Sequence, residues 1–141
     1  MSLLAAATVC VTFGAFQFCS DEEPKILPDA PIYLTTVKED NATDVYCSRL
    51  GGITEERHTY RDRSYVRVDC ETDEEVIEAG LDKRSSLDSV QQAVFFSVLT
   101  GKTPVVVIFD TDGREGKYEY RIRKVCEELD IEYRVIQVRE R

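Results

Sequence analysis

Residues 105–109, Val-Val-Val-Ile-Phe, form an uninterrupted apolar run, and this run decides the fold. A half-exposed strand alternates apolar and polar side chains, whereas a short run that is apolar throughout is typical of a central strand covered on both faces. Apolar residues recur at helical spacing on both sides of the run, at Leu87, Val90, Val94 and Val98 before it and at Tyr118, Ile122, Val125 and Leu129 after it. A buried strand between two amphipathic helices predicts an α/β fold.

The segments upstream of this unit predict a meander of strands. Val66, Val68 and Cys70 alternate with Arg67 and Asp69, which is the two-residue period of a half-buried strand. We expect the domain to begin with a helix that is capped by Asp40 or Asn41 and ends at Gly51-Gly52, followed by strands at 53–60, 65–72 and 74–79. A helix of about 15 residues, capped by Ser85 or Ser86, then leads to the strand at 105–109. A helix at 115–129 and a strand at 131–138 complete the order. The order α-β-β-β-α-β-α-β predicts a mixed β-sheet of about five strands flanked by helices.

The length of 141 residues accommodates one domain, which we place at residues 39–141, after a proline-containing linker at residues 21–38. The net charge of −9 argues against a general polyanion-binding protein, because affinity for phosphates comes from clustered Lys and Arg. Arginines nevertheless gather over residues 49–67, where they outnumber the acidic residues. Any nucleic-acid contact is therefore expected in that segment.

The first 20 residues form a leader without a charged side chain, and an acidic run begins at Asp21. An apolar leader of this length predicts a signal peptide, and therefore an exported or periplasmic protein. No Lys or Arg follows Met1, and no clear cleavage site precedes Asp21, so two alternatives stay open. The first alternative is that the leader is an uncleaved membrane anchor. The second is that residues 3–18 form a buried first strand of a cytoplasmic protein.

Three of the five cysteines, Cys47, Cys70 and Cys126, lie in the domain. A disulfide between Cys47 and Cys70 suits an exported protein, and three small buried hydrophobic residues are the alternative. The chain has no Cys-x-x-Cys motif, and His58 is its one histidine. This composition argues against a zinc site. We expect His58 to be a surface residue.

Asp69 lies late in one predicted strand, and Glu78 lies at the end of the next. A tight turn between antiparallel neighbours would bring both carboxylates to one side of the sheet. Such pairs of hard oxygen ligands hold Mg²⁺ while leaving coordination positions for water and phosphate. Lys83 and Arg84 follow in the next loop, where a cation would hold a phosphate oxygen or activate a water molecule. The alternative is a solvated acidic hairpin.

The segment Arg67-Val68-Asp69-Cys70-Glu71-Thr72, followed by Glu78, Lys83 and Gln91, resembles a group of small bacterial exported proteins in the PD-(D/E)XK, or restriction-endonuclease-like, nuclease superfamily. Tyr46-Cys47, Gly51-Gly52, Glu55 and residues 100–104 extend the resemblance, which spans roughly residues 46–110. The resemblance implies the superfamily's α-β-β-β-α-β core. It also implies that Asp69 and Glu78 are metal ligands for Mg²⁺ or Mn²⁺, that Glu55 is an accessory acid, that Lys83 is the catalytic lysine, and that Gln91 faces the site.

The sequence departs from that family at the lysine. The superfamily usually places it two residues after the second acid, and Gly80 occupies that position here. Lys83 or Arg84 would then have to take the role. If neither reaches the site, we expect metal binding with slow cleavage or none.

A second constellation lies at the end of the buried strand. Residues 107–114, Val-Ile-Phe-Asp-Thr-Asp-Gly-Arg, resemble the Asp-x-Asp element of Toprim domains, in which both aspartates bind Mg²⁺. Toprim also requires an upstream strand that ends in a catalytic Glu, and Glu71 matches this element loosely. The alternative for Asp110 and Asp112 is a turn and helix cap, because Asp-Gly is ordinary turn chemistry.

Three hypotheses about function follow. The first is a metal-dependent nuclease that hydrolyses phosphodiester bonds of DNA or RNA. The second is a catalytically inactive exported domain with a binding or structural role on the same fold. The third is a Toprim-like, Mg²⁺-binding domain that uses Asp110 and Asp112.

Overall fold

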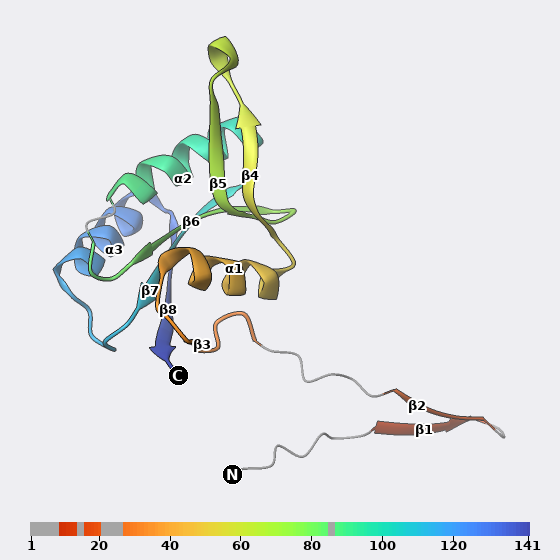
Figure 1. The fold of residues 1–141 in the computed structure, drawn as a ribbon. Coiled ribbons are helices and arrows are strands. Elements are labelled where there is room, and N and C mark those ends of the chain that lie inside the picture. Colours follow the sequence, from red (N-terminus) through yellow and green to blue (C-terminus); the bar gives the residue numbers. More distant parts are fainter. Residues whose placement is uncertain (1–8, 14–15, 21–26, 85–86) are drawn as a thin grey trace.

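A computed structural model describes residues 9–13, 16–20, 27–84 and 87–141 of the chain. Its main sheet is mixed and has six strands in the order β3-β8-β7-β6-β5-β4 (Figure 1). The elements are β3 (Ile32–Leu34), α1 (Glu39–Leu50), β4 (Ile53–Thr59), the 3₁₀ turn η1 (Arg61–Arg63), β5 (Tyr65–Glu71), β6 (Glu75–Leu81), α2 (Leu87–Thr100), β7 (Thr103–Asp110), α3 (Lys117–Leu129) and β8 (Glu132–Glu140). The predicted α/β class and element order are confirmed. The sixth strand is β3, which lies in the segment we expected to be a linker.

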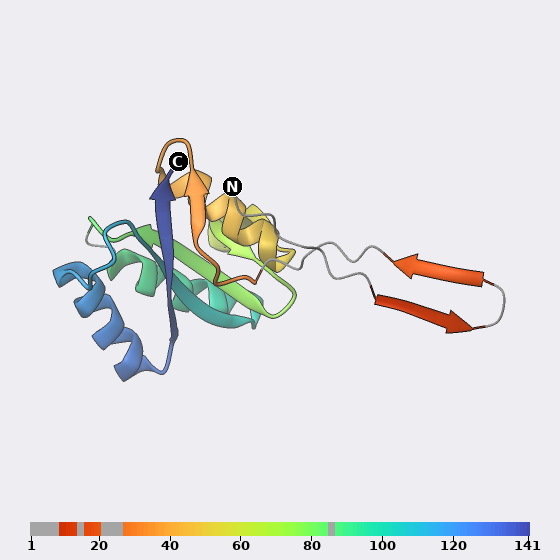
Figure 2. The ribbon, with the colours of Figure 1, turned by 90° about the horizontal axis from the view of Figure 1, so that it is seen from below.

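Strand direction changes in the middle of the sheet. β5 runs antiparallel to both β4 and β6, whereas β6, β7, β8 and β3 run parallel to one another. Helix α1 covers one face, and α2 and α3 cover the other (Figure 2). The parallel strands are linked by α2 and α3, as expected for βα crossovers.

The apolar run of β7 explains this layering. Val105, Val107 and Phe109 pack under α1, and Val106 and Ile108 pack under α2 and α3. All five residues are fully buried. The prediction of a central strand covered on both faces is therefore confirmed.

The predicted buried face of α2 is confirmed at Val90 and wrong at Leu87, Val94 and Val98, which are exposed, Val98 by 77%. Beside Val90 the helix buries Ala93 and Phe96, with Phe96 packed against Val68 and Val76 of the sheet. A phenyl ring buries more apolar area than a valine, so Phe96 sets the rotation of the helix. The predicted cap at Ser85 or Ser86 lies outside the described residues.

Two further helix predictions need correction. Helix α3 begins at Lys117 rather than residue 115, and it buries Glu119, Ile122 and Cys126, while Val125 and Leu129 are exposed. Helix α1 begins at Glu39 after an N-cap at Lys38, which makes no side-chain capping bond, so neither Asp40 nor Asn41 is the cap.

A disulfide joins Cys47 of α1 to Cys70 of β5. This confirms the first of the two alternatives for these cysteines, whereas Cys126 is a free, buried thiol. Gly52 lies against the bridge: an added Cβ there would lie 2.8 Å from Cys47 Sγ and 2.9 Å from Cys70 Sγ. The bridge therefore attaches α1 to the strand that carries Asp69.

The leader contributes a separate antiparallel pair, β1 (Val9–Phe13) and β2 (Phe16–Ser20), which has its own two-stranded sheet. Neither strand pairs with the described part of the main sheet. In the described residues, no helix has the length and apolar character needed to cross a membrane. Export stays a prediction.

Candidate metal site at the β5–β6 divergence

Asp69 and Glu78 lie where β5 and β6 separate. The two strands pair through Cys70 with Ile77 and Glu71 with Val76, and the pairing stops there. Beyond that point, carboxylates accept the hydrogen bonds of the open ladder: the Asp69 amide donates to Glu78 Oε1 at 3.4 Å, and the Ala79 amide donates to Asp69 Oδ2 at 2.9 Å. The tight turn between the strands therefore brings the two predicted acids into contact.

The pair is electrostatically unfavourable in the absence of a cation. Burial and, after it, the neighbouring Asp69 carboxylate together raise the pKa of Glu78 to about 9. Burial also raises the pKa of Asp69 to about 6, against the lowering effect of the Ala79 amide. The charges of Glu39 and Glu55 act in the same direction as burial on Asp69. At neutral pH, the pair therefore retains one proton when no cation is bound.

Helix α1 adds an acid that sequence reasoning missed. Glu39 accepts a hydrogen bond from the Leu81 amide at 3.2 Å, which holds its carboxylate against β6. It lines a cavity of about 380 Å³ together with Asp40, Asp44, Glu55 and Asp69. Glu39 lies two helical turns before Cys47, on the same face of α1. Because the disulfide joins Cys47 to Cys70, the neighbour of Asp69, this face is turned toward Asp69.

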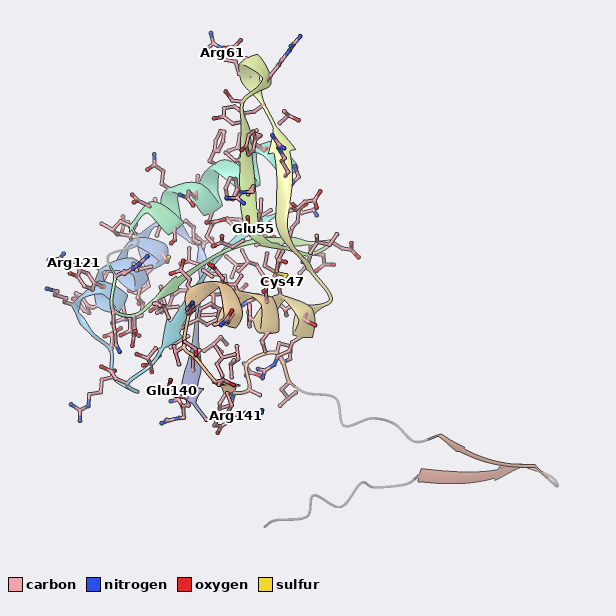
Figure 3. All side chains as sticks on the ribbon, viewed as in Figure 1. Cys47, Glu55, Arg61, Arg121, Glu140 and Arg141 are labelled. Carbon is pink, nitrogen blue, oxygen red and sulfur yellow. A yellow bond between two sulfur atoms is a disulfide. The ribbon has the colours of Figure 1, made fainter. Side chains whose placement is uncertain are left out.

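A second cavity, of about 520 Å³, lies between β5 and α2. Glu55, Arg67 and Asp69 line both cavities, and Gln91 lines the second. Glu55 pairs with Arg67 at 2.8 Å and has a left-handed backbone, with φ of 57°. Such strained residues cluster at functional sites. The predicted residues Glu55, Asp69 and Gln91 thus line one cavity (Glu55 is labelled in Figure 3).

Lys83 and Arg84 lie elsewhere. Both are exposed in the turn after β6, and Lys83 lines another cavity with Thr111 and Arg139. Lys83 follows Glu78 by five residues and lies in the turn in which the Arg84 amide donates to the Leu81 carbonyl at 3.2 Å, and it lines neither cavity at Asp69. Among the described residues that line the two cavities at Asp69, Arg67 is the one cation.

A second acidic group lies at the carboxyl ends of β6 and β7. Carboxylate oxygens of Asp82, Asp110 and Asp112 all lie within 4.8 Å of one another. Sequence reasoning missed Asp82 as a candidate. Asp82 follows a strand and precedes α2, and this is the place of the catalytic acid in the Toprim pattern, to which we matched Glu71. Glu71 instead pairs with His58 and, at 2.6 Å, with Lys102. His58 is therefore half-buried and paired rather than a free surface residue.

The oxygens of this second group already have donors. Asp82 accepts from the Thr111 amide at 2.8 Å and from the Thr111 hydroxyl. Asp110 accepts from the amides of Asp112 and Gly113, at 3.0 and 2.7 Å, and Asp112 accepts from the Arg114 amide. These are the bonds of a tight turn, which agrees with the simpler of the two interpretations of Asp110 and Asp112.

Carboxylates are the right donors for a hard divalent cation at either group. The comparisons with known proteins add no relative: no family model, curated protein or solved structure matches this chain.

Proposed function

We propose that the chain is a divalent-metal-dependent phosphodiesterase that acts on nucleic acid at Asp69 and Glu78. The observation that carries the proposal is the contact of the buried Glu78 with the half-buried Asp69, which lines two cavities. Perturbed carboxyl groups in a cleft are a mark of functional sites. The order of elements around the pair also agrees with the resemblance to PD-(D/E)XK nucleases.

Each residue of the site has a proposed role. Asp69 and Glu78 would hold Mg²⁺ or Mn²⁺, with Glu39 available from α1 as a further oxygen donor. The ion would supply charge neutralisation and an activated water at the phosphodiester. Arg67, held by Glu55, is placed to contact a phosphate oxygen, a role we expected of Lys83 or Arg84. Gln91 presents an amide to the same cavity.

The test is cleavage of plasmid DNA, single-stranded DNA and RNA by the full chain, after EDTA treatment and addition of Mg²⁺ or Mn²⁺. Asp69→Asn and Glu78→Gln should each abolish cleavage, because one carboxylate cannot replace the pair. Glu128→Gln is the matched control, since Glu128 is an exposed acid on α3. Cleavage that persists in both site variants would refute the proposal.

A second candidate function uses the other acidic group. The three carboxylate oxygens within 4.8 Å favour a Toprim-like Mg²⁺ site at Asp82, Asp110 and Asp112. Under this candidate, Asp110→Asn abolishes cleavage, and Glu78→Gln leaves it intact. Absence of both cleavage and metal binding in the wild-type chain would favour an inactive exported domain with a binding or structural role.

A further inference from the structure

The β4–β5 hairpin projects beyond the rest of the sheet, and α2 runs beside its base (Figure 1). Residues 57–67 of this hairpin, which we call the arm, carry four arginines and one aspartate in a chain with a net charge of −9. Arg61 extends from the tip of the arm (Figure 3). The arm is therefore a local positive surface on an acidic protein, which is a match for phosphates.

Aromatic side chains interleave with these arginines. Tyr65 is 50% exposed, and the guanidinium of Arg57 lies 3.5 Å from its ring centroid. Tyr60 and Phe95 are also exposed, and their rings make an edge contact with centroids 5.3 Å apart. Phe95 belongs to α2, so the aromatic surface continues from the arm onto the helix.

The same surface leads into the cavity that contains Asp69. Phe95 lines that cavity together with Gln91, Gln92 and Arg67, and its volume of about 520 Å³ lies in the range of small-ligand pockets. An aromatic wall offers a face on which a base can stack, and two glutamine amides offer donors and acceptors for a base edge. A base is free to stack on protein rings only when it is unpaired.

We propose that the arm and the adjoining face of α2 bind a single strand of nucleic acid, with one unpaired nucleotide in the cavity beside Asp69. Arg61 and Arg63 contact phosphates along the arm, and Tyr65 and Phe95 stack on bases. This inference rests on the proposed function, because the bound nucleic-acid strand would lead to the Asp69–Glu78 pair. It adds the substrate class: single-stranded or locally unpaired nucleic acid.

The test is fluorescence anisotropy of the full chain with a labelled 20-nucleotide oligothymidylate and with a duplex of equal length, both in EDTA. The single strand should bind at least about tenfold more tightly than the duplex. Tyr65→Leu and Phe95→Leu keep apolar bulk but remove a ring, and each should weaken single-strand binding by about tenfold. Circular dichroism confirms that each variant is folded.

Charge variants provide the second measurement. Arg61→Gln and Arg63→Gln should each reduce the slope of log affinity against log salt by about 0.7, the value for one contact to a single-stranded phosphate. Arg121→Gln is the matched control, because Arg121 is an exposed arginine on α3 that lies away from the arm in Figure 3. It should leave the slope unchanged.

Equal affinity for single strand and duplex would overturn the proposal, as would wild-type affinity in both ring variants. Loss of binding in the arginine variants alone would also overturn it, because simple attraction of a polyanion needs no stacking. Binding in EDTA is independent of hydrolysis. Single-strand binding that depends on the rings, in a protein that cleaves nothing, would therefore support the arm and refute the phosphodiesterase.

Discussion

Two groups of carboxylates lie on neighbouring strands of one sheet and differ in what surrounds their oxygens. Asp82, Asp110 and Asp112 accept hydrogen bonds from backbone amides and from the Thr111 hydroxyl. Asp69 and Glu78 accept one amide each, one of them at 3.4 Å, and Glu78 is buried while Asp69 is half-buried. The first group brings oxygens of three acids within 4.8 Å of one another, whereas in the second group burial raises the pKa of both carboxyl groups.

The difference shows that proximity of acids is a poor guide to a cation site by itself. A carboxylate whose oxygens already accept amide bonds stabilises a turn as an anion. A pair without enough donors repels, and it gains most from a proton or a divalent cation. We therefore expect Asp82→Ala to destabilise the protein and Glu78→Gln to stabilise it. The following measurements break or sharpen that comparison.

The largest effect is expected from the disulfide, which holds α1 and its Glu39 over the Asp69–Glu78 pair. The double variant Cys47→Ala/Cys70→Ala should lose about 3 kcal/mol of unfolding free energy, because the sequence separation of 23 residues no longer restricts the unfolded chain. Urea denaturation measures this loss. A loss below about 1 kcal/mol would show that α1 docks without the bridge. The double variant should also bind Mg²⁺ more weakly than the wild-type chain in a titration, because α1 carries Glu39.

The next effect is at Asp82. Asp82→Ala should cost about 2 kcal/mol in metal-free buffer, because the Thr111 amide and hydroxyl lose their acceptor. Glu128→Ala is the control, because Glu128 is an exposed acid on α3, and the change should cost less than about 0.5 kcal/mol. Thermal denaturation with EDTA present gives both values. If Asp82→Ala instead increases stability, repulsion among Asp82, Asp110 and Asp112 outweighs their hydrogen bonds to the turn.

Divalent metal should stabilise the wild-type chain. With a dissociation constant of about 1 mM, about 10 mM Mg²⁺ adds about 1.4 kcal/mol. Glu78→Gln should remove this gain, and Asp110→Asn should retain it. The midpoint of thermal unfolding with and without Mg²⁺ measures the effect. The reverse pattern would transfer the metal site to the β6–β7 edge.

The last measurement is the pH dependence of stability that Glu78 contributes. Its pKa is raised in the folded state from an ordinary value of 4.5 to about 9, so the folded chain retains a proton that the unfolded chain loses between those values. Stability of the metal-free protein should therefore fall as pH rises through this window. Glu78→Gln should flatten the slope and raise the unfolding free energy at pH 8. Urea denaturation at several pH values tests it, and an unchanged slope contradicts the raised pKa.

The order of elements along the chain and the contact of Asp69 with Glu78 followed from local patterns, because alternation and a short turn determine which consecutive strands pair. The rotation of α2 did not, since Val94 and Val98 fit the helical period as well as Ala93 and Phe96 do. Only the position of β5 and β6 shows that Phe96 has a place to pack. Sequence reasoning likewise expected Lys83 at the acids, whereas the direction of β6 carries it to another cavity.

The sequence by itself determined the α/β class, the central strand at residues 105–109 and the pairing of Asp69 with Glu78, because each depends on neighbours close in the chain or on apolar periodicity. Tertiary structure decided which other groups join them. Glu39 comes from 30 residues upstream of Asp69, and Asp82 meets Asp110 only because β6 and β7 lie side by side. Such contacts depend on how helices dock and strands order, and no local pattern contains that information.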